Sequence, residues 1–261
     1  MDVSNENVLT IRSAVRSVLE GLNAGDTILI AVSGGADSLA GAQAEKVAAQ
    51  VKTMGITDVE IIPVQVNITD GLEASARRAR YAALDSAADK YGAALILLGH
   101  TREDQAETVL LGLARGSGTR SLSGMATRNG KYARPLLAIT REETVAACIE
   151  AELDPWIDPH NSDSQFARVR ARNNVIPVLE RELGPGISAS LARSATLLRD
   201  DADALDEIAA KEIAKLDLSS LDIAALEVIS RAIRTRVIRA AIYAAGAPKG
   251  SITADHVASV E

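Results

Sequence analysis

A glycine-rich loop between a strand and a helix is the feature that most constrains this chain. Residues Thr27 to Val32 form a short β-branched apolar run, and an alanine-rich helical pattern extends from Ser38 to about Met54. Between them lie Ser33, Gly34, Gly35, Ala36 and Asp37. Because glycine has no Cβ, backbone amides of this loop can approach an anion at the helix N-terminus. The pattern predicts either a phosphate site or a plain β-to-α turn with capping Ser and Asp.

The side chains of the loop bear on the phosphate interpretation. The hydroxyls of Ser33 and Ser38 can donate to phosphate oxygens, whereas the Asp37 carboxylate needs a cation or the reacting group beside it. A magnesium ion can bridge the Asp37 carboxylate and the phosphate oxygens, which makes Asp37 a candidate metal ligand. No Gly-Lys-Ser or Gly-Lys-Thr follows the glycines, so the loop is not a Walker loop.

Strand and helix patterns alternate through the first two thirds of the chain. Further apolar runs at 59–66 and 94–98 read as strands, and helical spacing covers about 71–91 and 104–114. This alternation predicts an α/β fold with a doubly wound, mainly parallel, Rossmann-like sheet. Residues 116–134, rich in Gly, Ser and Arg, read as an exposed loop. Thr140 and Glu143 form a capping-box pattern at the start of a helix that should end near residue 152.

The sequence also predicts a domain boundary. Gly184-Pro185-Gly186 interrupts the pattern, and an almost wholly helical pattern follows to Ala245. We expect residues 1–183 to form one domain, which contains the glycine-rich loop, and residues 184–261 to form a small all-α domain.

Composition excludes several classes of protein. No stretch approaches the roughly 18 uninterrupted apolar residues of a membrane span, and the N-terminus lacks the basic and apolar regions of a signal peptide, so we expect a cytosolic protein without membrane contact. The single cysteine, Cys148, rules out an internal disulfide and paired-cysteine metal sites, and reads as a buried helical residue. Aromatic residues make up only 2% of the chain, which argues against base-stacking platforms.

Basic residues gather in two acid-free segments although the net charge is −7. One segment runs from Arg115 to Arg141 and the other from Gln165 to Leu179. They favour either contacts to nucleic-acid phosphates or two solvated faces.

Several motifs resemble one known family. Ser33 to Ser38 resemble the SGGxDS signature of the PP-loop ATP pyrophosphatases, which cleave ATP between the α and β phosphates and adenylate a carbonyl oxygen. Gly99 to Thr108 resembles the H-x-x-D-D-Q-x-E-T segment of the tRNA(Ile)-lysidine synthetases within that family. Further similar motifs follow in the same order, over residues 26–181: Arg115–Gly118, Arg134–Leu137, Trp156–Asn161, Phe166, Arg168, Arg170, Arg172 and Pro177.

Three departures from the family pattern stand out. Glu103 replaces the usual Asp, residues Val66–Leu72 lack a His and an Arg that many members carry, and the helical tail is shorter than in the longer members. Glutamate keeps the charge of aspartate but has a longer side chain, which changes the geometry of any metal site at this position.

The resemblance implies that residues 1–183 form a PP-loop ATP-binding catalytic domain. It also implies a two-step ligation on tRNA(Ile) with a CAU anticodon. The C2 oxygen of the wobble cytidine attacks the α-phosphate of ATP and releases pyrophosphate, and the ε-amine of free L-lysine then displaces AMP to give lysidine. The cofactors implied are ATP, bound by Ser33 to Ser38, and Mg²⁺, held by Asp37 and Asp104. A homodimer is compatible with the sequence.

The resemblance also suggests roles for individual residues. Asp37, His100, Asp104 and Arg115 are the candidate catalytic residues. Arg115 could face the α-phosphate or the RNA backbone, and His100 could accept a proton or make a structural hydrogen bond at a strand end. The tRNA-binding candidates are Arg115, Arg120, Arg168, Arg170 and Arg172.

Carboxylates are the candidates for holding magnesium or the ammonium group of lysine. Glu103 and Asp104 each share a helix face with Glu107. Glu142 or Glu143 could serve lysine instead, or simply cap a helix.

Other readings from the same sequence remain. One cysteine cannot support the sulfur chemistry of tRNA thiolases, and the chain has no room for the glutaminase domain of amidotransferases. NAD synthetase chemistry, or a tRNA-binding domain without catalysis, stays as an alternative.

Overall fold

The computed structural model describes residues 5–32, 38–69, 71–116, 118–153, 164–248 and 252–261. The chain forms two compact units, one of residues 1–111 and 125–192 and the other of residues 112–124 and 193–261. The first unit contains the sheet, and the described part of the second is helical. The domain boundary at residue 184 remains a prediction.

The sheet has four strands in the order β1-β2-β4-β3. Strands β1 (Thr27–Ala31), β2 (Ala93–Leu98) and β4 (Tyr132–Ala133) are parallel, and β3 (Arg128–Asn129) pairs antiparallel with β4. In the register, Leu29 lies opposite Ile96, which lies opposite Tyr132. The mainly parallel α/β sheet predicted from the sequence is therefore confirmed.

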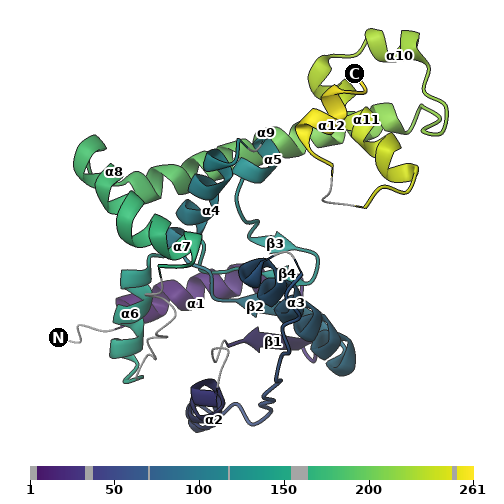
Figure 1. The fold of residues 1–261 in the computed structure, drawn as a ribbon. Coiled ribbons are helices and arrows are strands. Elements are labelled where there is room, and N and C mark those ends of the chain that lie inside the picture. Colours follow the sequence, from purple (N-terminus) through teal and green to yellow (C-terminus); the bar gives the residue numbers. More distant parts are fainter. Residues whose placement is uncertain (1–4, 33–37, 70, 117, 154–163, 249–251) are drawn as a thin grey trace. The chain divides into compact units, whose positions relative to one another are not determined.

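Helices α1 (Glu6–Leu19) and α3 (Leu72–Tyr91) cover opposite faces of the sheet (Figure 1). Leu95 and Leu97 of β2 pack with Val18 of α1, whereas Ile96 and Leu98 pack against α3. Successive side chains of a strand point to opposite faces, so an uninterrupted apolar run is what a strand covered on both sides requires.

The strand predicted at residues 59–66 does not form. Pro63 lies in the middle of this run and has no N–H to donate to a sheet ladder. Ile61 and Val64 remain 47% and 41% exposed, and the Glu60 side chain accepts hydrogen bonds from Lys90 and Tyr91 at the end of α3. The prediction was wrong because it counted β-branched residues without the cost of the proline.

The loop predicted at 116–134 contains more structure than expected. Helix α5 (Thr119–Leu122) forms within it, and β3 and β4 form a hairpin whose turn contains Gly130 at φ 57°. A two-residue hairpin turn needs this left-handed conformation, which glycine adopts at little cost.

The start of helix α6 (Arg141–Glu150) was predicted correctly. Thr140 Oγ1 accepts from the Glu143 N–H at 2.9 Å, and the Glu143 carboxylate accepts from the Thr140 N–H at 2.7 Å. Other helices that lie wholly or mostly in the first unit are α2 (Ser38–Thr53), α4 (Arg102–Ala114), α7 (Ala167–Arg170), the π-helix η2 (Ala171–Val175) and α8 (Ile176–Leu183).

The second unit has its own core. Ala209 of α9 (Ile187–Ile213) packs with Ile233 and Val237 of α11 (Arg231–Ala244), surrounded by partly buried leucines and isoleucines. Helices α10 (Ile223–Glu227) and α12 (Ala254–Ala258) complete the unit. Across the described ranges, no helix combines the length and apolarity needed to cross a membrane.

Candidate active site

Three chain segments leave the sheet at the same edge, because β1, β2 and β4 run parallel. The segment after β1 leads into residues 33–38, the segment after β2 contains His100, and β4 is followed directly by Arg134. Ligands of open α/β sheets bind at this carboxyl edge. The predicted ATP-binding residues Ser33, Gly34, Gly35, Ala36 and Asp37 lie outside the described residues, and Ser38 is the first residue of α2.

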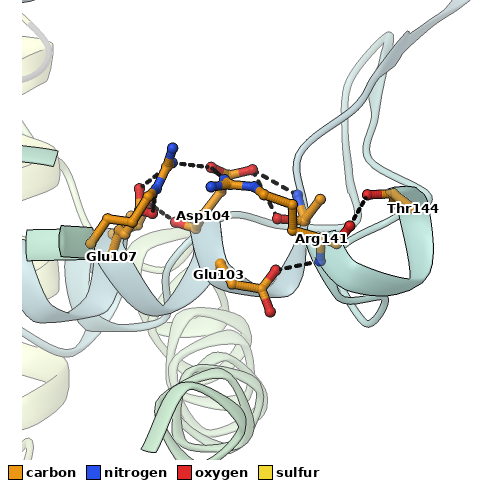
Figure 2. Close-up of polar contacts among 8 residues, drawn as sticks. Glu103, Asp104, Glu107, Arg141 and Thr144 are labelled. Atoms are coloured by element: carbon orange, nitrogen blue, oxygen red, sulfur yellow. Dashed lines mark hydrogen bonds and ion pairs between the residues drawn. The ribbon is translucent and has the colours of Figure 1, made fainter. Parts of the chain in front are cut away.

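Asp104, in the first turn of α4, is surrounded by hydrogen-bond donors (Figure 2). One carboxylate oxygen accepts from the N–H and hydroxyl of Thr101 at 2.8 and 3.2 Å. The other accepts from Nη2 of Arg141 at 3.3 Å and Nη2 of Arg172 at 3.2 Å. This carboxylate therefore caps α4 and joins two arginines from elements distant in sequence.

Glu107 lies one turn further along α4 and is fully buried. Its two carboxylate oxygens accept from Nε and Nη2 of Arg172, at 2.6 and 3.1 Å. Burial raises the pKa of Glu107, while the hydrogen bonds and charge of Arg172 oppose that rise. The pair is a bidentate, charge-assisted contact in a poorly solvated place.

Glu103, also in the first turn of α4, contacts the start of α6. Its Oε2 atom accepts from the backbone N–H of Arg141 at 2.8 Å. Arg141 is the first residue of α6, where backbone N–H groups lack helical partners and a negative charge is favourable. The longer arm of glutamate thus ties the start of α4 to the start of α6.

His100 follows β2 and is neutral at physiological pH. Burial, with the charges of Arg134, Arg168 and Arg77, lowers its pKa to about 4, although Asp104 acts in the opposite direction. Its buried Nδ1 atom has no hydrogen-bond partner among the described residues. The imidazole can therefore offer an unused hydrogen-bonding atom to a ligand.

The five arginines predicted to contact tRNA have different surroundings. Arg172 holds Glu107 and Asp104, Arg168 pairs with Glu73 at 3.3 Å, and Arg170 donates to the carbonyls of residues 164 and 165 at 2.8 Å. In the second unit, Arg120 pairs with Asp203 and Asp206.

Arg115 is exposed and, within the described residues, makes no ion pair. A phosphate could reach Arg115 without displacing a protein partner.

The described residues do not by themselves fit a magnesium site. They contain no group of three or more His, Cys, Asp or Glu side chains that could hold a metal ion. Both oxygens of Asp104 already accept from donors, two of which are cationic. Asp37, the other candidate ligand, lies outside the described residues, so the magnesium assignment stays a prediction.

The two lysine-binding candidates on α6 differ. Glu143 completes the helix cap, and the backbone and hydroxyl of Thr140 lower its pKa. Glu142 is exposed. The structure gives Glu143 a capping role and leaves Glu142 accessible.

The site includes residues to which sequence reasoning gave no role. Arg141, the last residue of a basic segment, and Arg134, which lies within that segment, were given no role of their own, and Tyr81 was not considered. Arg134 opens a family-like motif, which was the available signal. Nothing in the sequence indicated that Tyr81 on α3 would face Arg134, which donates to its hydroxyl at 3.1 Å.

Comparison with known proteins gives two kinds of match. The model of the PP-loop domain family matches residues 41–179. The chain is 47% identical to the tRNA(Ile)-lysidine synthase of Thermobifida fusca (strain YX), covering 97% of this chain and 88% of that protein. It is 44% identical to the tRNA(Ile)-lysidine synthase of Streptomyces coelicolor (strain ATCC BAA-471 / A3(2) / M145), covering 92% and 78%.

A solved structure is similar in fold. The U34-tRNA thiolase NcsA from Methanococcus maripaludis, solved with its 4Fe-4S cluster, superposes with a TM-score of 0.55 over 76% of this chain and 70% of that chain. The two sequences are 16% identical, so the likeness concerns the fold alone.

Proposed function

The chain belongs to the tRNA(Ile)-lysidine synthase family of PP-loop proteins, and from that membership we propose that it is an ATP-dependent ligase that joins lysine to tRNA(Ile). The bond forms at C2 of the wobble cytidine in the CAU anticodon, through an adenylated cytidine. The observation that carries the proposal is the 47% identity to a tRNA(Ile)-lysidine synthase over 97% of the chain. The proposed substrates are ATP, free L-lysine and the tRNA.

In the proposed first step, the C2 oxygen of the cytidine attacks the α-phosphate and pyrophosphate leaves. Ser33 and Ser38, with the backbone amides between them, bind the phosphates at the edge where β1 ends. Negative charge builds on the phosphoryl oxygens, so a fixed positive group lowers the barrier. Arg115 takes this role in the proposal, because it is exposed and unpaired among the described residues.

In the proposed second step, the lysine ε-amine attacks C2 and AMP leaves. An unperturbed lysine ammonium has a pKa of about 10.4 and must lose a proton first. His100 can accept a hydrogen bond from the ammonium, but its pKa of about 4 makes the imidazole a poor proton store at neutral pH. We infer that His100 orients the amine. The proton is transferred to water or to the phosphate group of the departing AMP.

The carboxylates of α4 serve the site by fixing its geometry. Glu103 and Asp104 hold the first residue of α6, and Glu107 holds Arg172 of η2. Elements that are far apart in sequence are thereby joined at the carboxyl edge. Such fixed surroundings matter because small displacements of reacting groups are costly in rate.

Binding of tRNA is assigned to exposed basic side chains. Arg115 is the strongest candidate, and Arg120, Arg168 and Arg170 retain donors beside their present partners. Phosphate contacts of this kind position RNA, and recognition of the unpaired anticodon bases adds specificity.

The proposal is tested by pyrophosphate release from ATP with purified tRNAs. We expect release with tRNA(Ile) carrying the CAU anticodon and little release with the CAU-anticodon methionine tRNA. Release without any tRNA, but with nicotinic acid adenine dinucleotide and ammonia, would point to NAD synthetase chemistry. Tight tRNA binding without turnover would point to a non-catalytic binding domain.

A further inference from the structure

Arg134 is a buried cation that has no counter-ion among the described residues. It follows β4 directly and is only 5% exposed. Among the residues that the structure describes, it forms no ion pair with a carboxylate. Its Nη1 donates to the Ala126 carbonyl at 3.1 Å and its Nη2 to the Tyr81 hydroxyl at 3.1 Å, while its buried Nε has no partner.

A second arginine converges on the same place. Nη2 of Arg77 donates to the Tyr81 hydroxyl at 3.4 Å, and the Arg77 guanidinium lies 4.9 Å from the centre of the Tyr81 ring. The neighbouring acid, Asp85, is directed elsewhere, because it accepts from the Tyr132 hydroxyl at 2.7 Å and lies 3.8 Å from Lys131. Two guanidinium groups therefore donate to one tyrosine hydroxyl.

Such an arrangement is unfavourable in the absence of an anion. Removing a charged group from water is unfavourable unless the group is paired, and an unpaired buried N–H adds to that cost. A purely structural role at this position would be served equally well by an uncharged side chain. The unused Nε donor and the excess positive charge are what an anionic ligand would complete.

The place of Arg134 at the carboxyl end of β4 indicates which anion it binds. Strand β4 is separated from β1 only by β2, so their carboxyl ends lie about 10 Å apart at one edge of the sheet. An arginine side chain and a polyphosphate chain together span that distance. His100, whose Nδ1 is also buried and unpartnered, follows the intervening strand.

We propose that Arg134, supported by Arg77 and Tyr81, binds the polyphosphate of ATP and retains the pyrophosphate that the reaction releases. This inference rests on the proposed use of ATP at the carboxyl edge of the sheet. It adds a phosphate-binding group that comes from β4, in addition to the loop after β1.

The test measures thermal unfolding with and without inorganic pyrophosphate, in the absence of tRNA and lysine. Wild-type protein should gain stability with pyrophosphate, because a ligand that binds only the folded state raises Tm. Arg134→Gln should be at least as stable as wild type without pyrophosphate, and its affinity for pyrophosphate should fall about tenfold or more. Arg128→Gln, an exposed arginine on the same hairpin, is the control and should behave as wild type.

Two results would overturn the inference. In the first, Arg134→Gln has a lower Tm than wild type but keeps the full rise in Tm with pyrophosphate, which would mean that Arg134 has only a structural role. Normal pyrophosphate binding together with weakened tRNA binding would assign the anion to the RNA backbone.

A second variant covers the case in which Arg134→Gln does not fold. Arg77→Gln changes an exposed side chain and should also weaken pyrophosphate binding; unchanged affinity in this variant would contradict the shared site. The readout is independent of lysidine formation. A protein that makes no lysidine but loses pyrophosphate binding with Arg134→Gln would defeat the proposed function and leave this site standing.

Discussion

The guanidinium of Arg172 holds both carboxylate oxygens of Glu107, at 2.6 Å from Nε and 3.1 Å from Nη2. Arg172 lies in the π-helix η2, and Glu107 lies on α4, 65 positions earlier in the chain. π-helical turns are rare and often occur at functional sites. Here the turn carries the arginine that neutralises the one fully buried carboxylate among the described residues.

Replacing Arg172 should therefore destabilise the protein strongly. Arg172→Met leaves the Glu107 carboxylate buried and unpaired, and we expect a loss of about 3–5 kcal/mol in the free energy of unfolding. Urea denaturation measures this loss. Arg181→Met removes an arginine that is 68% exposed and should cost less than about 1 kcal/mol. Equal losses in both variants would contradict the buried pair, and the added change Glu107→Gln should recover part of the stability of Arg172→Met.

Shortening Glu103 should also have a measurable cost. Glu103→Asp restores the residue usual in the family but withdraws the carboxylate from the Arg141 N–H, and we expect a loss of about 0.5–1.5 kcal/mol. The control is Glu142→Asp on the exposed first turn of α6, which should change stability by less than about 0.5 kcal/mol. If Glu103→Asp left the free energy of unfolding unchanged, the contact between Glu103 and the Arg141 N–H would contribute nothing to stability.

His100 should make stability depend on pH. Its pKa is about 4 in the folded protein against an ordinary value of 6.5, so the unfolded chain binds more protons between these values. The contribution of His100 is complete above pH 6.5 and is lost as the pH falls towards 4. The total is roughly 3 kcal/mol.

The comparison protein for the pH series is His100→Asn, which cannot titrate in this range. Urea unfolding from pH 7.5 to 4.5 should give a shallower decline for the variant than for wild type. Parallel curves would mean that His100 is protonated equally easily in the folded and unfolded states.

Arg115 should contribute to the salt dependence of tRNA binding. Each phosphate neutralised by the protein releases counterions, so Arg115→Gln should weaken binding and reduce the slope of log affinity against log salt by about 0.7–0.9. Filter binding at several salt concentrations measures both. Arg181→Gln is the control for a lost surface charge. If the affinity for tRNA did not change between low and moderate salt, the assignment of the tRNA-binding arginines to RNA phosphates would be wrong.

The central strand β2 could be predicted because it is buried on both faces of the sheet. Ala94 to Leu98 forms an unbroken apolar run, and the structure covers it with α1 on one side and α3 on the other. The run at 59–66 resembles it in composition, but Pro63 cannot join a ladder. The hairpin of β3 and β4 was missed because its strands are only two residues long and carry no periodic signal.

The partners of the site residues could not be predicted from spacing. The sequence places Asp104 and Glu107 on one face of a helix, but only the fold brings Arg172 and Arg141 to them. Arg172 looked like a phosphate-binding residue because it shares a two-residue spacing with Arg168 and Arg170. In the structure Arg172 lies in η2 and donates to Glu107 and Asp104, and nothing in a charge count reveals these partners.

The most direct test of the central claim is incorporation of labelled lysine into purified tRNA with ATP and magnesium, comparing the intact protein with Asp37→Ala. The account predicts label only in tRNA(Ile) with the CAU anticodon, released as lysidine on digestion, and absent with the variant. Pyrophosphate release without lysine incorporation, or label that persists with Asp37→Ala, would contradict it.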